Sequence, residues 1–116
     1  MKGNQADKTR LLHIQDAIQE IKSYIKGLGF SSFREDSKTK FATIKQIEII
    51  GEAANNISKG TKELYSKINW RRIIALRNIL VHEYFGVDEN IIWTIITKDL
   101  IAFEKQIDHV LKDLSD

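Results

Sequence analysis

The residues best suited to chemistry lie in one run, Arg77-Asn78-Ile79-Leu80-Val81-His82-Glu83-Tyr84. The imidazole of His82 can take a proton from a ribose 2′-hydroxyl or give one to a leaving 5′-oxygen. The guanidinium of Arg77 can hold a phosphate through two hydrogen bonds and stabilise charge that grows in the transition state. These roles suffice for metal-independent transesterification of RNA, which leaves a 2′,3′-cyclic phosphate. DNA lacks the 2′-hydroxyl and would not react in this way.

Helical geometry limits how these side chains can meet. Arg77 and Tyr84 are seven residues apart and share a face, and Asn78 and His82, four apart, share a neighbouring one. Arg77 and His82 are five apart, which places them about 140° apart around an ideal helix. They could converge if the helix is distorted near Gly86, or if a symmetric dimer packs two such helices around one groove. The dimer also accounts for apolar residues in excess of one bundle face: Ile49, Ile79, Ile91 and Ile101.

An ordinary structural explanation also fits this run. Arginine, asparagine and histidine near the end of a helix often cap carbonyls, pair with carboxylates and interact favourably with the helix dipole. Spacing alone favours that explanation. His13 and His109 are expected on solvated faces, and no histidine has metal-ligand spacing. The sequence therefore predicts no metal site and no cofactor.

Four long helices must position the run. Apolar residues at helical spacing predict helices over about residues 7–26, 38–58, 70–85 and 89–114, with a loop at 30–37 and a helical turn or loop at 61–67. Asp36 or Ser37, and Asp88, are expected to cap helices. The predicted inward residues are Leu11, Ile14, Ile18, Ile21, Ile25, Leu28, Phe41, Ile44, Ile47, Ala54, Ile57, Trp70, Ile73, Ile74, Leu80, Val81, Ile92, Ile96, Leu100, Phe103, Ile107, Val110 and Leu114, with Leu12, Ala17 and Tyr24 widening the first stripe.

A few further residues carry expectations. Gly51 lies inside a helix, where glycine costs about 1 kcal/mol relative to alanine, so close approach of another helix or a second copy is expected there. Glu48 and Glu52 could orient a side chain of the run or make ordinary salt bridges. Arg71 and Arg72 could extend a phosphate-binding track or lie on a solvated face, and Trp93 is assigned to packing or to the dimer surface.

Composition bounds the remaining possibilities. The chain has 116 residues, no cysteine, no proline and a formal net charge of +2. This length suits one domain over residues 1–116, and the absence of cysteine excludes disulfides and thiol nucleophiles. The charge is too small to indicate nucleic acid by itself. No apolar stretch approaches a membrane span and the amino terminus is polar, so we expect a soluble cytoplasmic protein with no membrane association. The fold class predicted is an all-α antiparallel bundle.

The run and its flanks resemble the HepT family of the HEPN superfamily. Arg77, four intervening residues, His82, one residue and Tyr84 match its Arg-x4-His-x-Tyr motif. The stretch Ile47-Glu48-Ile49-Ile50-Gly51-Glu52-Ala53-Ala54 resembles its second-helix signature, and Trp70, Leu76-Arg77-Asn78, Phe85-Gly86-Val87-Asp88 and Ile92-Trp93 resemble its flanks. The resemblance covers about residues 8 to 114.

The resemblance implies a function, a fold and partners. Arg77 and His82 match the catalytic pair of an RNase toxin, Asn78 matches the polar residue beside the arginine, and Tyr84 matches a tyrosine that the nucleotidyltransferase antitoxin MntA modifies with AMP. The implied fold is a HEPN-like up-and-down bundle of four to five helices that forms a homodimer with both motifs at a shared cleft. RNA is the implied substrate, and some relatives act on tRNA. The alternative is a non-catalytic subunit of a minimal nucleotidyltransferase that binds a nucleotide or the partner.

Overall fold

A computed structural model describes residues 2–79 and 88–114 of the chain. All regular structure in these two ranges is helical, and neither contains a β-strand, as predicted. The elements in chain order are α1 (Lys2–Ile25), α2 (Phe30–Glu35), α3 (Ser37–Asn55), α4 (Lys59–Leu64), α5 (Trp70–Ile79), α6 (Glu89–Thr94), the π-helical turn η1 (Ile95–Asp99) and α7 (Leu100–Leu114).

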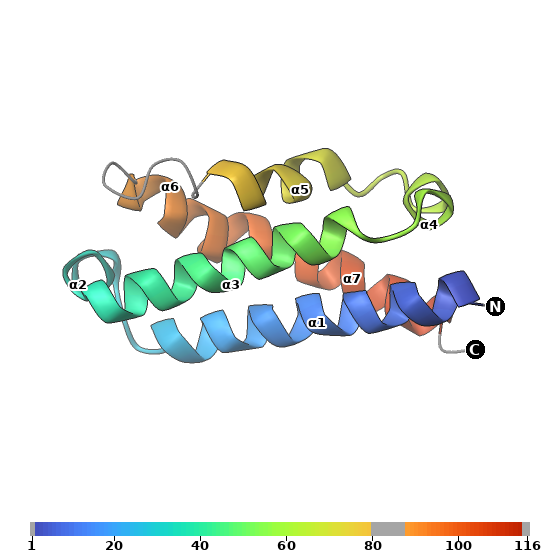
Figure 1. Ribbon diagram of the computed structural model, residues 1–116. Helices are drawn as coiled ribbons and strands as arrows, with labels where there is room; N and C mark the ends of the chain where they lie inside the picture. Colours follow the sequence, from blue (N-terminus) through green and yellow to red (C-terminus); the bar gives the residue numbers. More distant parts are fainter. Residues whose placement is uncertain (1, 80–87, 115–116) are drawn as a thin grey trace.

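The long helices run antiparallel to one another along the chain. Figure 1 shows α1 and α3 side by side, with α5 lying along α3 and with α6 leading into α7, which returns behind α3. The short helices α2 and α4 lie at opposite ends of this bundle. In both described ranges, no helix is long and apolar enough to span a membrane.

The core confirms most of the predicted inward residues. The seam of α1 and the stripe of the last helix are buried where the spacing of apolar residues predicted burial. The confirmed buried residues are Leu11, Ile14, Ala17, Ile18, Ile21, Ile44, Ile47, Ala54, Ile57, Trp70, Ile73, Ile92, Ile96, Leu100, Phe103, Ile107 and Val110. Others pack at the edge of this core, namely Ile25, Ile74 and Leu114. Leu80 and Val81 lie outside the described residues.

Two predicted core residues are exposed. Phe41 is 44% exposed and Leu12 is 40% exposed. Ala54 lies in the middle of the buried face of α3. Phe41 is thirteen residues before it, so its side chain points about 140° away from Ala54 around the helix axis. Thr43 has the inward position in that turn. The prediction that Phe41 faces the core, which rested on its hydrophobicity, was therefore wrong.

The segment predicted as a loop at 30–37 contains a helix. Phe33 anchors α2 because it is fully buried, and its ring centroid lies 5.2 Å from that of Trp93. Phe30 adds a second ring contact with Trp93 at 6.0 Å. Trp93 is thus a packing residue, which is one of the two roles expected for it. Asp36 then caps α3 as predicted, because its carboxylate accepts a hydrogen bond from the Thr39 backbone N–H.

The predicted helix over 89–114 has the expected bounds but includes a π-helical turn. In η1 the backbone N–H of Leu100 donates to the carbonyl of Ile95, five residues earlier. Both side chains are buried, so the wider turn keeps them on the core side of the helix. Asp88 caps α6 as expected, by accepting a hydrogen bond from the Asn90 backbone N–H.

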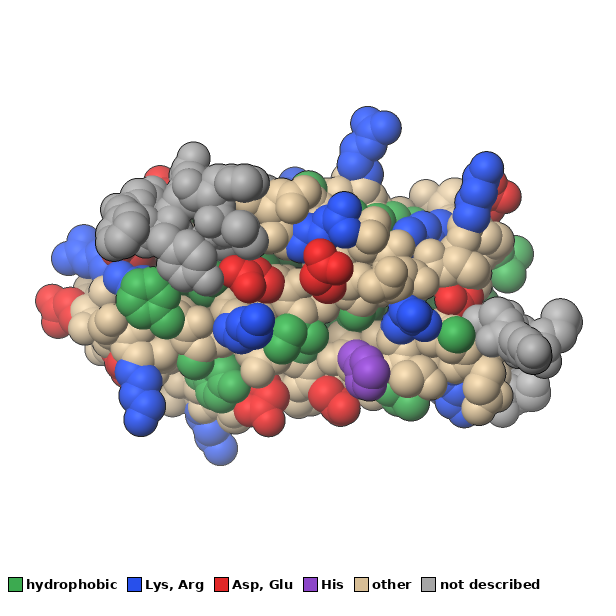
Figure 2. Space-filling view, viewed as in Figure 1, with side chains coloured by type: hydrophobic (Ala, Val, Ile, Leu, Met, Phe, Trp, Pro, Cys, Tyr) green, Lys and Arg blue, Asp and Glu red, His purple; other side chains and the backbone are tan. Residues whose placement is uncertain are grey.

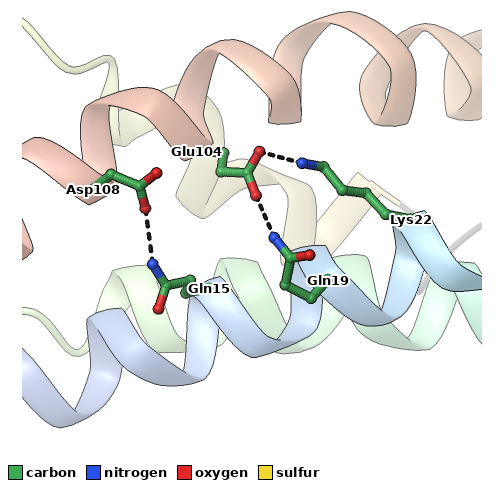
Figure 3. A network of polar contacts seen from close by, with 5 residues as sticks. All are labelled: Gln15, Gln19, Lys22, Glu104 and Asp108. Carbon is green, nitrogen blue, oxygen red and sulfur yellow. Dashed lines mark hydrogen bonds and ion pairs between the residues drawn. The ribbon is translucent and has the colours of Figure 1, made fainter.

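Polar contacts join α1 to α7 along the rim of the core. Gln15 donates to Asp108 at 2.8 Å, Gln19 donates to Glu104 at 2.6 Å, and Lys22 pairs with the same glutamate (Figure 3). These groups are mostly solvent-accessible and therefore add little to the free energy of folding. They do favour one register between the two helices.

A buried carboxylate attaches α4 to α1. Asp7 of α1 is only 2% exposed and accepts hydrogen bonds from the Ser58 backbone N–H (2.9 Å), the Ser58 hydroxyl (2.6 Å) and the Thr61 hydroxyl. Ser58 is in turn the N-cap of α4. Burial alone would raise the pKa of Asp7, but these hydrogen bonds, with Arg10 nearby, outweigh it, so the pKa lies below its usual value.

Replacing Asp7 with asparagine is expected to lower the free energy of unfolding at pH 7 by about 1–3 kcal/mol, because the amide cannot accept all of these hydrogen bonds.

This stabilisation should depend on pH. The pKa of Asp7 is lower in the folded than in the unfolded protein, so the carboxylate stabilises the fold fully above its unfolded pKa. That contribution disappears as pH falls through the folded pKa. The difference between wild type and variant should therefore shrink below about pH 4. Urea unfolding across pH measures this, with Asp16→Asn on the exposed side of α1 as the control. Equal effects of both substitutions would contradict it.

Candidate functional site

Arg77 and Asn78 lie near the end of α5, which the core holds firmly. Trp70 begins the helix and packs edge-on against Phe103, with ring centroids 6.0 Å apart. The Asn69 side chain accepts a hydrogen bond from the Arg72 backbone N–H, as an N-cap does. Leu76 is buried, whereas Arg77 is half-buried and Asn78 is exposed. The helix therefore holds the Arg77 backbone against the core and leaves its side chain at the surface.

Gly51 of α3 forms the contact that brings α5 close. A Cβ added at Gly51 would lie 2.6 Å from the backbone nitrogen of Arg77 and 2.8 Å from its Cβ. Those distances are too short for any side chain, so only glycine permits this approach. Close approach of another helix was one of the two reasons expected for Gly51, and it is confirmed.

Glu52, the next residue of α3, pairs with Arg77. One terminal nitrogen of the guanidinium lies 3.5 Å from a carboxylate oxygen of Glu52, and the two side chains are 28% and 60% exposed. The Nε of Arg77 is buried and has no hydrogen-bond partner among residues 2–79 and 88–114. Glu52 thus contacts a side chain of the run. Glu48 instead forms an ordinary salt bridge, in which its carboxylate oxygen lies 3.9 Å from Nζ of Lys45. The N–H groups of the second terminal nitrogen are the donors that a phosphate could engage.

Lys62 of α4 is a neighbour of Arg77 that the sequence did not indicate. Its ammonium donates to the Asn55 carbonyl at 3.2 Å. Burial lowers the pKa of Lys62, and the positive charge of Arg77 lowers it further. The negative charge of Asp7 acts in the opposite direction and raises this pKa. Two cations from different helices therefore lie within electrostatic range. No spacing rule could indicate this, because α4 and α5 meet only through the fold.

A groove of about 440 Å³ between α1 and α3 borders the Glu52 side of the site. Arg10, His13 and Lys45 line it together with Glu48 and Glu52, and Ile49 and Ala53 are also among its lining residues. Positive and negative side chains are mixed on this face of the bundle (Figure 2). His13 is exposed, as is His109, which lies 3.8 Å from Asp113; both are on solvated faces as expected.

The other predicted site residues have different outcomes. His82 and Tyr84 lie outside the described residues, so their convergence with Arg77 stays a prediction. Arg72 pairs with Asp99 at 2.8 Å, and Arg71 is exposed. In the parts of the chain that the structure describes, no group of three or more histidine or acidic side chains is placed to hold a metal ion. Ile49 is 37% exposed and Ile91 is 51% exposed, whereas Ile101 is half-buried.

Comparison with known proteins identifies the family of this chain. The family model described as Ribonuclease HepT-like matches residues 14–110, which include all of α3 and α5. A candidate RNase of Caldanaerobacter subterraneus is 38% identical over 88% of this chain and 91% of its own length. A protein of Thermococcus cleftensis named Probable ribonuclease HepT is 35% identical over 93% of this chain and 98% of its own length. No solved structure matches.

The described residues form an all-helical bundle, and the family match assigns this bundle to the HepT type. The chain belongs to the Ribonuclease HepT-like family.

Proposed function

We propose that this protein is an endoribonuclease that cleaves RNA by attack of a ribose 2′-hydroxyl, without a metal ion. The observation that carries the proposal is Arg77, whose backbone is held against Gly51 while its guanidinium reaches the surface beside Glu52. A cation fixed in this way can bind the scissile phosphate without reorganising. Membership of the HepT-like family supports this role.

In this proposal the residues of the run have separate roles. Arg77 holds the phosphate and stabilises its developing charge. His82 transfers the proton to or from the reacting oxygens, and Asn78, exposed on α5, supports the bound strand. Because Arg77 and His82 diverge on one straight helix, we propose a composite site at the cleft of a homodimer. The exposed side chains of Ile49 and Ile91 are available for its interface.

We further propose that the protein is the toxin of a HepT–MntA toxin–antitoxin pair. Its single domain over residues 1–116 would act on cytoplasmic RNA, with tRNA as one candidate. A nucleotidyltransferase partner would silence it by transferring AMP to Tyr84. Tyr84 and Arg77 are seven residues apart, so on a continuous helix an AMP group would bring bulk and negative charge to the arginine face. A Tyr84→Phe toxin should then escape silencing by transferase activity.

The test is RNA cleavage by the purified protein, without its partner, in EDTA. We expect wild type to cut tRNA or total RNA and to leave 2′,3′-cyclic phosphate ends. His82→Ala should lose this activity by at least about 100-fold, since general acid–base catalysis contributes 10²–10⁴. Circular dichroism should show both proteins equally folded. Absence of cleavage on any RNA, with tight nucleotide binding, would instead indicate a non-catalytic subunit of a nucleotidyltransferase.

A further inference from the structure

A second surface, away from the α1–α3 groove, carries an excess of positive charge. A hollow of about 630 Å³ lies between α4 and the beginning of α5. Four cations line it, with Glu63 as the only carboxylate among its described lining residues. The cations are Lys59, Lys62, Lys67 and Arg71. This is a local arrangement of cations that the small net charge of the chain conceals.

Two of these cations are not engaged by carboxylates. Neither Lys67 nor Arg71 forms an ion pair with any described residue, and both are exposed. Lys59 lies 3.9 Å from Glu63, and both of these side chains are highly exposed, so that pair is weak. Arg72 differs from Arg71, because Asp99 holds it at 2.8 Å. The hollow can therefore accept an anion without first breaking a strong ion pair.

The hollow leads toward Arg77. Lys62 lines it and also lies within electrostatic range of Arg77. Arg71 and Asn78 are seven residues apart on α5, so they project from nearly the same face, and both are exposed. Lys62 of α4 thus links Arg77 to the cations of the hollow, and on α5 the polar side chain of Asn78 lies on the same face as Arg71.

The lining also indicates what kind of contact the hollow makes. Among the described residues that line the hollow, Trp70 is the only aromatic one, and because it is buried it offers little ring surface for stacking a base. Ser66 and Asn69 add polar groups that can bind phosphate oxygens. We propose that this hollow binds backbone phosphates of the RNA strand next to the cleaved bond, without reading its sequence. The inference rests on the proposed function, since it assigns the path of that enzyme's substrate.

The test compares two double variants that each remove two positive charges. Lys67→Gln/Arg71→Gln neutralises the hollow, and Lys26→Gln/Lys38→Gln, near the opposite end of the bundle from α4, is the control. The probe is a single-stranded 2′-O-methyl oligoribonucleotide, which keeps the phosphates but cannot be cleaved. Its affinity is measured by fluorescence anisotropy over a range of salt concentrations.

We expect the hollow variant to bind about ten-fold more weakly at low salt and the control to bind as wild type does. The slope of log affinity against log salt should fall by about 1.4, because each phosphate contact of a single strand contributes about 0.7. On cleavable RNA, the loss should appear mainly as a higher KM. Wild-type affinity and slope in the hollow variant, or equal losses in both variants, would overturn the inference.

These outcomes remain separable from failure of the proposed function. If wild type cleaves RNA and the hollow variant binds the probe normally, the phosphate path is wrong and the nuclease assignment stands. If wild type cleaves nothing but the hollow variant alone loses affinity for the probe, the nuclease assignment fails, and the hollow stands only as a site that binds RNA phosphates.

Discussion

Arg77→Lys is expected to slow RNA cleavage by about 100-fold or more while the protein stays folded. Loss of one preorganised donor to a developing oxyanion typically costs 10²–10³ in rate. Lysine keeps the charge but presents a compact ammonium in place of a planar fork. In this structure one terminal guanidinium nitrogen faces Glu52 and Nε is buried, so the second terminal nitrogen must serve the phosphate, and a single ammonium cannot do both. Initial rates on labelled RNA would give kcat and KM for the variant.

The control for this prediction is Glu52→Gln, which keeps the guanidinium and removes only its charged partner. The Glu52 side chain is 60% exposed, so the pair should contribute no more than about 1 kcal/mol to stability. We expect a change in cleavage rate of only a few-fold for this variant and near wild-type thermal unfolding for both. Cleavage by Arg77→Lys at the wild-type rate would contradict the role given to Arg77.

Gly51→Ala should destabilise the protein by about 1–3 kcal/mol, the range typical of overpacking. At an ordinary helix position the same substitution would stabilise by up to about 1 kcal/mol. The sign reverses because the new Cβ would meet backbone and Cβ atoms of Arg77, and neither can move without shifting α5. Urea unfolding would measure the difference in the free energy of unfolding.

Gly60→Ala is the matched control for this substitution. Gly60 also lies in a helix, α4, but a Cβ added there would meet nothing within 4 Å. We expect Gly60→Ala to leave stability unchanged or to raise it by up to about 1 kcal/mol. A stabilising Gly51→Ala would mean that α3 and α5 are not in this close contact. A folded Gly51→Ala protein should also cleave RNA more slowly, because displacing α5 displaces Arg77.

Much of the architecture was predictable from the sequence, because local pattern determines where helices form. Apolar residues three and four apart placed the seam of α1 and the stripe of α7 in the core, and Asp36 and Asp88 indicated helix starts. A glycine inside a strongly helical segment also predicted the close contact at Gly51. The pairing of Arg77 with His82 came from the family motif, since spacing alone favoured an ordinary helix end, and it stays a prediction.

Other features depend on which helices meet, and local pattern does not determine that. Helix α2 exists because Phe33 finds a buried place against Trp93, sixty residues along the chain. Phe41 is exposed because its position on α3 points about 140° away from the buried face of that helix.

The run of reactive residues Arg77–Tyr84 could be identified from the sequence, but the charged residues that surround Arg77 could not. Arg77 gains Glu52 as a partner only because Gly51 lets α5 approach α3. It gains Lys62 as a neighbour because Asp7 holds α4 against α1. The sequence by itself therefore determined the long helices and the reactive residue types. The tertiary structure decided which charges surround Arg77, because residues distant in the chain become neighbours only when side-chain packing brings their helices together.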